Sequence, residues 1–251
     1  MTNRQRIFLR VIFALTCIEL VLAVLGIFFG PEESHYYIFT TLACLGMLVL
    51  LFVPVFTKKV FKVVIPTSLY IVFTIFCFCA IILGDVKDFF GTYRHWDSML
   101  HFSSGMMLAV FGFILVNTLN HTKKGHVRLS PFFVAATAFC FVMMVQSLWE
   151  ICEFLCDEWF GLNAQTYMVS GSSYSKDGVM LVGHEALRDT MEDFMLDGIG
   201  GLIISVIGYI NLKKGKPGFV NAELRKVDEE DDAKNKPAHR KKHHMKEKQK
   251  K

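Results

Sequence analysis

Three aspartates, Asp189, Asp193 and Asp197, follow one another at intervals of four residues at the start of a long apolar segment. An α-helix completes a turn in about 3.6 residues, so this spacing places the three carboxylates on one helical face. Carboxylates inside a lipid bilayer are costly unless they meet a cation, a hydrogen-bond donor or water. The spacing therefore predicts a polar site within a hydrophobic helix.

Two other apolar segments carry polar residues at helical spacing. Asp97 and His101 lie one turn apart at the start of one segment, and a carboxylate beside an imidazole fixes its tautomer and raises its basicity. At about 100° per residue, four polar residues near the end of the other segment fall within one arc: Gln146, Glu150, Glu153 and Asp157. Each group suits either metal binding or proton transfer.

The composition places the chain among membrane proteins. Of its 251 residues 53% are hydrophobic, 24 are Phe, and the mean hydropathy is +0.39, well above ordinary globular usage. Six segments approach the ~20 apolar residues that a helix needs to span a bilayer: 7–29, 36–56, 63–84, 97–119, 131–156 and 189–210. We therefore predict an all-α polytopic membrane protein with six transmembrane helices.

Basic residues in the short loops indicate the orientation, since Lys and Arg gather on the cytoplasmic side. They flank the start of the first segment and fill the second and fourth loops, at Arg4, Arg6, Arg10, Lys58, Lys59, Lys62, Lys123, Lys124 and Arg128. This pattern predicts that both the N and the C terminus are cytoplasmic. The three polar groups then share the outward half of the membrane and predict a pocket that opens to the outside above apolar inner halves.

The chain divides into three parts. Residues 1–95 hold three apolar segments and are expected to be mainly structural; their one interior acid, Glu19, could pair with a neighbouring helix or belong to the polar site. Residues 96–210 hold the three polar groups. Residues 211–251 form a charged tail with a basic end, expected to be disordered and to lie against anionic lipid headgroups. No aromatic residue interleaves with the basic residues of that end, from Arg240 onward, so nucleic acid is not an expected partner.

The deeper polar residues predict a divalent metal site. Several carboxylates without a facing Arg or Lys repel one another unless a cation binds between them. Carboxylate oxygens with one imidazole suit Mg²⁺, Mn²⁺ or Ca²⁺, and also Zn²⁺ or Fe²⁺. The predicted metal ligands are His101, Glu153, Asp193 and Asp197. Glu150 and Asp97 are the predicted catalytic residues, which would handle a proton.

Other interpretations are open. Asp97, Asp157 and Asp189 lie at expected helix ends, where capping or the membrane interface explains a carboxylate equally well. Three hypotheses remain for the whole site: a metal-dependent hydrolase or transferase on a lipid-type substrate in the outer leaflet, an ion-coupled transporter, and a non-catalytic scaffold or accessory protein. The sequence does not decide whether the chain is an enzyme.

The second half resembles a known family. It contains Trp96-Asp97-x-x-x-His101-Phe102-x-x-Gly105, then Trp149-Glu150-x-x-Glu153-Phe154, then Asp189-Thr190-x-x-Asp193-x-x-x-Asp197-x-x-Gly200. Over about residues 96–201 these motifs resemble the YjdF-type family of uncharacterised bacterial inner-membrane proteins. The resemblance implies a multi-pass protein of the bacterial plasma (inner) membrane and implies no established reaction. The charged tail and the Cys-flanked fifth segment depart from the family.

Overall fold

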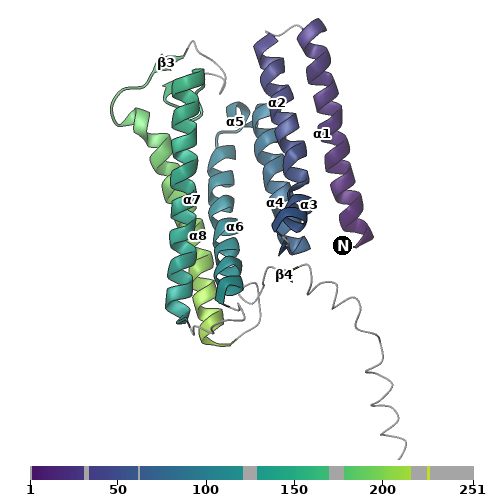
Figure 1. Cartoon of the computed structure of the whole chain (residues 1–251). Coiled ribbons are helices and arrows are strands. Elements are labelled where there is room, and N and C mark those ends of the chain that lie inside the picture. The colour runs from purple at the N-terminus through teal and green to yellow at the C-terminus, as the bar shows by residue number, and fades with distance from the viewer. Residues whose placement is uncertain are drawn as a thin grey trace, which may run out of the picture.

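Long helices in two groups make up most of the molecule and lie side by side (Figure 1). This computed structural model describes residues 2–30, 34–61, 63–120, 129–169, 178–215 and 225–226. The predicted tail, 211–251, lies outside the described residues except for 211–215 and 225–226. Its disorder and its contacts with lipid headgroups therefore stay predictions.

The first two helices run side by side in opposite directions (Figure 1). α1 (Asn3–Phe29) begins at a capping box, in which Thr2 Oγ1 accepts from the Gln5 backbone N–H and Gln5 Oε1 accepts from that of Thr2. α2 (Ser34–Leu51) follows after a short connection. Both helices fall on segments that the sequence predicts to span a membrane.

The second span is broken near its end. α2 is followed by α3 (Val53–Phe56) and η1 (Thr57–Phe61), and the helix axis bends by 44° at the break after Leu51. Pro54 lies in the first turn of α3, where its missing N–H cannot continue the hydrogen bonding of α2. The continuous helix predicted over 36–56 is thus a bent pair.

The third span begins later than the sequence predicts. Val63–Val64 form strand β1, which pairs antiparallel with β4 (Arg225–Lys226), and the helix starts only after Pro66. The span consists of α4 (Thr67–Cys77), continued by the wider helix η2 (Phe78–Val86). A short helix, α5 (Phe89–Thr92), then leads into the second group.

The second group contains three long helices: α6 (Trp96–Asn120), α7 (Pro131–Phe160) and α8 (Arg188–Lys213). Ser130 caps α7, and Gly161, with a φ of 63°, ends it in the left-handed region that glycine adopts freely. Between α7 and α8 lie the antiparallel strands β2 (Met168–Val169) and β3 (Val179–Met180), and then the short helix η3 (Glu185–Leu187).

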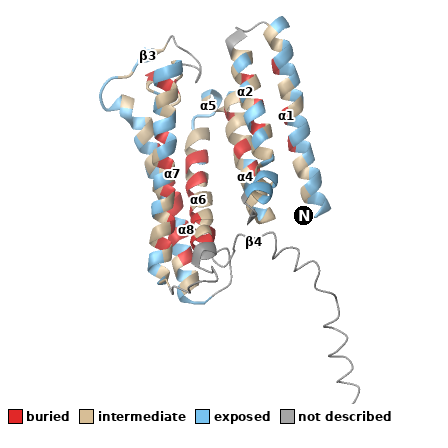
Figure 2. Ribbon diagram, viewed as in Figure 1, coloured by how far each residue is buried: buried red, intermediate tan, exposed pale blue. Residues whose placement is uncertain are grey.

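Each group has its own apolar core. One core consists of Ile12, Cys44, Met47, Cys77, Ile82 and Val86, and the other of Ala109, Phe113, Ala135, Ala138, Val142 and Ile204. Large apolar side chains are also exposed, such as Phe28 at 73% and Phe132 at 72%. Exposed residues run along much of α1 and α7 (Figure 2). Helices that are apolar on both their inner and outer faces are typical of proteins that reside in lipid.

Five helices in the described part of the chain are long and apolar enough to cross a membrane, and the bent pair would make a sixth. The prediction of an all-α multi-pass membrane protein is confirmed. α1 begins and α8 ends at the same end of the molecule (Figure 1), as an even number of crossings requires. Which end faces the cytoplasm stays a prediction.

Candidate metal centre

Two glycines bring α6 and α8 into close contact at the level of the polar residues. A Cβ atom at Gly105 would collide with the backbone oxygen of Asp197, and one at Gly200 with the backbone oxygen of Phe102. Small residues allow helix backbones in a membrane to approach in this way. The contact brings Asp197 of α8 within reach of His101 on α6.

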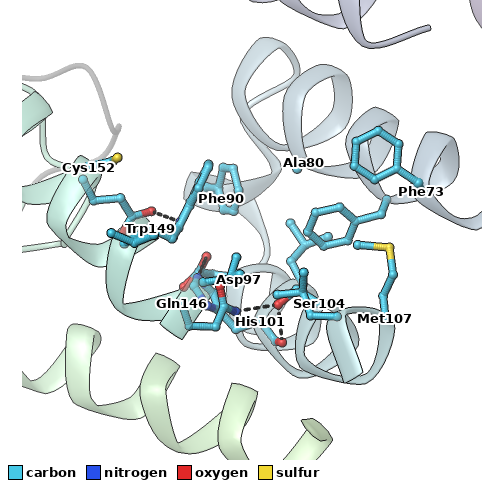
Figure 3. A pocket seen from close by; sticks show the side chains of 16 residues that line it. Phe73, Ala80, Phe90, Asp97, His101, Ser104, Met107, Gln146, Trp149 and Cys152 are labelled. Atoms are coloured by element: carbon cyan, nitrogen blue, oxygen red, sulfur yellow. Dashed lines mark hydrogen bonds and ion pairs between the residues drawn. The ribbon is translucent and has the colours of Figure 1, made fainter. Parts of the chain in front are cut away.

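One ring nitrogen of His101 is bound to a buried carboxylate. His101 Nδ1 lies 2.8 Å from Asp197 Oδ2, and Asp197 is only 1% exposed. The other carboxylate oxygen of Asp197 forms a short hydrogen bond with the hydroxyl of Ser104. Gln146 Nε2, from α7, donates to Ser104 Oγ at 2.7 Å (Figure 3). All three long helices of the second group therefore contribute to one buried polar network.

The other ring nitrogen of His101 faces two further carboxylates. His101 Nε2 lies 3.6 Å from Asp97 Oδ1 and 3.8 Å from Asp193 Oδ2. Asp97, His101 and Asp193 each offer one ligand atom, and these atoms lie within 4.8 Å of one another. Metal–ligand bonds to nitrogen and oxygen are about 2.1 Å long. A small inward movement of these side chains would suffice to enclose a divalent cation.

The predicted acids of α7 lie outside this group of three. Glu150 is buried, and its Oε2 accepts from Gln165 Nε2 at 3.4 Å. The same Gln165 amide donates to Thr190 Oγ1 on α8 at 3.0 Å. Glu153 Oε1 accepts from Trp149 Nε1 at 2.8 Å. The structure thus gathers Asp97, His101, Asp193 and Asp197, while Glu150 and Glu153 bind other partners nearby.

Asp157 holds the loop that follows α7. Its two carboxylate oxygens accept from the backbone N–H groups of Ala164, at 2.7 Å, and Gln165, at 3.0 Å. Asp157 thus binds the backbone of the loop and lies outside the group around His101. It also positions Gln165 to reach both Glu150 and Thr190.

Ser104 is the polar residue that the sequence reasoning missed. It follows His101 by three residues on α6, so its position on the same face was readable from the helical period. A hydroxyl can return its hydrogen bond to its own helix backbone, and Ser104 Oγ does lie 2.8 Å from the His101 carbonyl oxygen. Its additional bonds to α7 and α8 depend on how those helices pack.

A cavity of about 410 Å³ adjoins the polar network and lies between the two groups of helices (Figure 3). The first group contributes Phe73, Phe76, Ala80 and Phe90 to its wall. The second group contributes apolar side chains, such as Leu100, Met107 and Trp149, and also polar ones, namely Asp97, His101, Ser104, Gln146 and Glu153. The cavity is therefore mostly apolar, and two of the three candidate metal ligands, Asp97 and His101, lie in its wall.

Below the polar network the second group is packed with apolar side chains. In the described residues, the packing at that level comes from Ala109, Phe113, Ala138, Val142 and Ile204. Ser205, on α8, is the one described residue with a buried side-chain oxygen or nitrogen that has no hydrogen-bond partner. Polar interactions between α6, α7 and α8 are thus concentrated in the half of the bundle that contains His101.

Glu19 lies apart from this network. Its Oε1 forms an ion pair with Lys87 Nζ at 2.7 Å, which ties α1 to the end of η2. Of the two roles that the sequence left open for Glu19, pairing with a neighbouring element is the one that the structure contains. The pair belongs to the first group of helices.

Comparison with known proteins identifies a family. No curated protein and no solved structure matches the chain. The family described as "Predicted membrane protein (DUF2238)" matches residues 9–214, which include every residue of the polar network and all of the candidate spans except the first residues of α1. The chain therefore belongs to this family of predicted membrane proteins.

Proposed function

We propose that the protein is a metal-dependent hydrolase or transferase that acts on a lipid-type substrate, with a divalent cation bound by Asp97, His101 and Asp193. The observation that carries the proposal is the position of carboxylates at both ring nitrogens of His101. Nδ1 is bound to Asp197, and Nε2 faces the carboxylates of Asp97 and Asp193. Metal-binding histidines typically donate their second ring N–H to a carboxylate in this way.

Electrostatics favour a cation at this position. Two carboxylates directed at one point in a low-dielectric environment repel each other, and a divalent cation between them removes that repulsion. One imidazole and two carboxylates suit Zn²⁺, Mn²⁺ or Fe²⁺. Three protein ligands leave at least one position for water or substrate, and a bound metal would make that water a better nucleophile.

The geometry supports a different division of roles from the one that the sequence suggested. Asp97, expected to handle a proton, is assigned to the metal, while Asp197, expected to bind the metal, is assigned to hold His101. Glu153 lines the cavity beside the metal ligands and is assigned to proton transfer. Glu150, which is buried and bound to Gln165, is the second candidate for that task.

The cavity supports a lipid-type substrate. Its volume of about 410 Å³ falls in the range of about 300–1,000 Å³ that small-molecule sites occupy. Phe73, Phe76 and Phe90 form an aromatic wall that suits a hydrocarbon chain, and His101 and Asp97 lie where a polar headgroup would be held. A substrate with one apolar chain and a polar head fits both sides of this cavity.

Ion-coupled transport is the weaker alternative. A carrier needs the polar site to be reached from both sides of the membrane. In the described residues, the packing below the network consists of apolar side chains such as Phe113, Val142 and Ile204. No observation in the described part of the chain specifically favours a carrier or a non-catalytic scaffold over an enzyme.

Several finer assignments accompany the proposal. The motifs between residues 96 and 201 support the YjdF-type name and a location in the bacterial inner membrane. The basic loops support cytoplasmic termini, and hence a site in the outer leaflet. The basic residues at the end of the chain support a contact with anionic lipid headgroups.

Turnover of lipid by purified protein tests the proposal. The full chain is reconstituted into vesicles that contain phosphatidylglycerol and phosphatidylethanolamine, and products are followed by mass spectrometry. We expect turnover that EDTA abolishes and that added Zn²⁺ or Mn²⁺ restores, and we expect none from His101→Ala. Turnover that survives EDTA, or protein loaded with metal that leaves every lipid unchanged, would count against the assignment.

A further inference from the structure

The polar network behind His101 draws one side chain from each helix of the second group. Gln146 lies on α7, Ser104 on α6 and Asp197 on α8, and all three are buried. The contacts run in sequence from Gln146 Nε2 to Ser104 Oγ, from Ser104 to Asp197 Oδ1, and from Asp197 Oδ2 to His101 Nδ1. The network therefore ends at the ring that faces the candidate metal position.

The hydroxyl of Ser104 has a single proton for two nearby acceptors. Its Oγ lies close to Asp197 Oδ1 and also 2.8 Å from the backbone oxygen of His101. A carboxylate accepts a stronger hydrogen bond than a neutral carbonyl does. The amide of Gln146 donates to the same Oγ at 2.7 Å and occupies one of its lone pairs. The hydroxyl proton is thus directed towards Asp197.

Both oxygens of Asp197 are then occupied by fixed donors. Oδ1 accepts from Ser104, and Oδ2 accepts the proton of His101 Nδ1. A neutral imidazole carries one proton, so a proton on Nδ1 leaves the lone pair on Nε2. Nε2 is the atom that faces Asp97 and Asp193.

We infer that Ser104 and Gln146 are positioning residues for the metal site, because they hold Asp197 in the place that fixes the tautomer and direction of His101. This inference rests on the metal site of the proposed function and deepens it. Neither residue is a metal ligand in this scheme, but both also line the cavity, so the test measures metal binding in the absence of a lipid substrate. Their effect reaches the metal only through Asp197 and the imidazole.

The chain offers a matched control in Ser205. This serine is also buried in the second group of helices, on α8, but its hydroxyl has no partner among the described residues. Removing either hydroxyl changes the volume of the packed bundle by the same amount. Only Ser104→Ala removes a contact to Asp197.

Zn²⁺ titration of the purified full chain tests the inference, with calorimetry as the measurement. Loss of an outer-shell partner typically weakens metal binding by about 10–100-fold. We expect Ser104→Ala to lower Zn²⁺ affinity by about 10-fold or more, and Gln146→Leu to lower it by less. Ser104→Thr keeps the hydroxyl and should restore most of the affinity, whereas Ser205→Ala should bind like the wild type.

A second measurement reports on the ring itself. In protein labelled with ¹⁵N-histidine and loaded with Zn²⁺, the nitrogen shifts of His101 should indicate one tautomer, with the proton on Nδ1 and the metal on Nε2. In Ser104→Ala the same signals should move towards a mixture of tautomers. A merely structural role for Ser104 would leave these shifts unchanged.

The outcomes separate this inference from the function on which it rests. Wild-type protein that binds no Zn²⁺ would overturn the proposed metal site and the positioning role together. Wild-type protein that binds Zn²⁺, with Ser104→Ala binding equally well and keeping one tautomer, would overturn the positioning role alone. Should Ser104→Ala fail to fold, the comparison of Gln146→Leu with the wild type tests the same network.

Discussion

The two groups of helices satisfy their buried polar groups in different ways. In the first group the threonine hydroxyls donate to backbone oxygens one turn earlier on the same helix, as in Thr16 to Ile12, Thr40 to Tyr36 and Thr74 to Tyr70. In the second group the buried side chains bond across helices, from Gln146 to Ser104 and from His101 to Asp197. The buried threonines of the first group therefore bond within single helices, whereas the buried network of the second group joins three helices.

This difference supports the second group as the location of the proposed function. A hydroxyl bonded to its own helix backbone fits a lipid environment without any partner. A carboxylate or an imidazole has no such option, so a helix that contains one must be placed against another polar group. His101, Asp193 and Asp197 therefore constrain how α6 and α8 pack, whereas Thr16 and Thr74 place no constraint on their neighbours.

Removal of the His101 ring should cause the largest loss of stability in the second group. His101→Ala leaves Asp197 buried with Ser104 as its remaining side-chain partner in the described structure. Loss of one partner of a buried ion pair typically costs about 3–5 kcal/mol. We expect a loss of stability of about that size when unfolding in SDS is measured in the presence of EDTA.

His95 provides the control for this prediction. It is exposed, six residues earlier in the chain, just before α6 begins. His95→Ala should unfold like the wild type. Equal stabilities for His95→Ala and His101→Ala would show that the buried network contributes nothing to the second group.

A substitution that disturbs the close contact between α6 and α8 should cause the next largest loss of stability. A methyl group at Gly105 would collide with the backbone oxygen of Asp197, so the two helices must move apart. Overpacking of this kind costs about 1–3 kcal/mol, and it should also lengthen the bond between His101 and Asp197. We expect Gly105→Ala to lower stability in SDS and to weaken metal binding.

Gly46, on α2, is the matched glycine in the first group. A Cβ atom there would meet nothing within 4 Å. Gly46→Ala should therefore be neutral or slightly stabilising, since alanine favours a helix more than glycine does. A destabilisation at Gly46 as large as that at Gly105 would remove the distinction between the two groups.

The ion pair of the first group should contribute less to the stability of the protein. Glu19 Oε1 and Lys87 Nζ are 2.7 Å apart, but the Lys87 side chain is 45% exposed. Pairs with an exposed partner contribute at most about 1 kcal/mol. A double-mutant cycle with Glu19→Gln and Lys87→Met should give a coupling energy of that order, with unchanged metal binding. A change in metal affinity in Glu19→Gln would instead include Glu19 in the site.

The smallest effect is expected for the hydroxyls that bond to their own helix. Thr74 donates to the Tyr70 carbonyl oxygen at 2.8 Å, and valine has nearly the same shape. We expect Thr74→Val to change stability by less than about 0.5 kcal/mol. A larger loss in the SDS unfolding experiment would mean that this hydroxyl has a partner on another helix.

The spans could be predicted from the sequence because they depend on length and hydropathy alone. The ends were less accurate where proline intervenes. Pro54 breaks the second span, and Pro66 delays the start of the third, and both effects could have been read from the missing N–H of proline. The pairing of Val63–Val64 with Arg225–Lys226 links distant segments, and no local pattern indicates it.

The site could be predicted only helix by helix. Helical spacing showed that Asp193 and Asp197 share a face, and that Asp97 and His101 share another. It could not show that Asp193 and Asp197 lie on opposite sides of the His101 ring, one near each nitrogen. That arrangement depends on the contact between α6 and α8 at Gly105 and Gly200. The spacing of residues within one helix does not show how two helices pack.

Metal content is the most direct test of the central claim that Asp97, His101 and Asp193 bind a divalent cation. Wild-type protein and Asp193→Asn are purified in detergent, dialysed against equal concentrations of Zn²⁺ and Mn²⁺, and measured by elemental analysis. We predict about one metal ion per wild-type chain and almost none in Asp193→Asn, with Ser205→Ala behaving as the wild type. Equal metal content in wild type and Asp193→Asn, or none in either, would contradict the account.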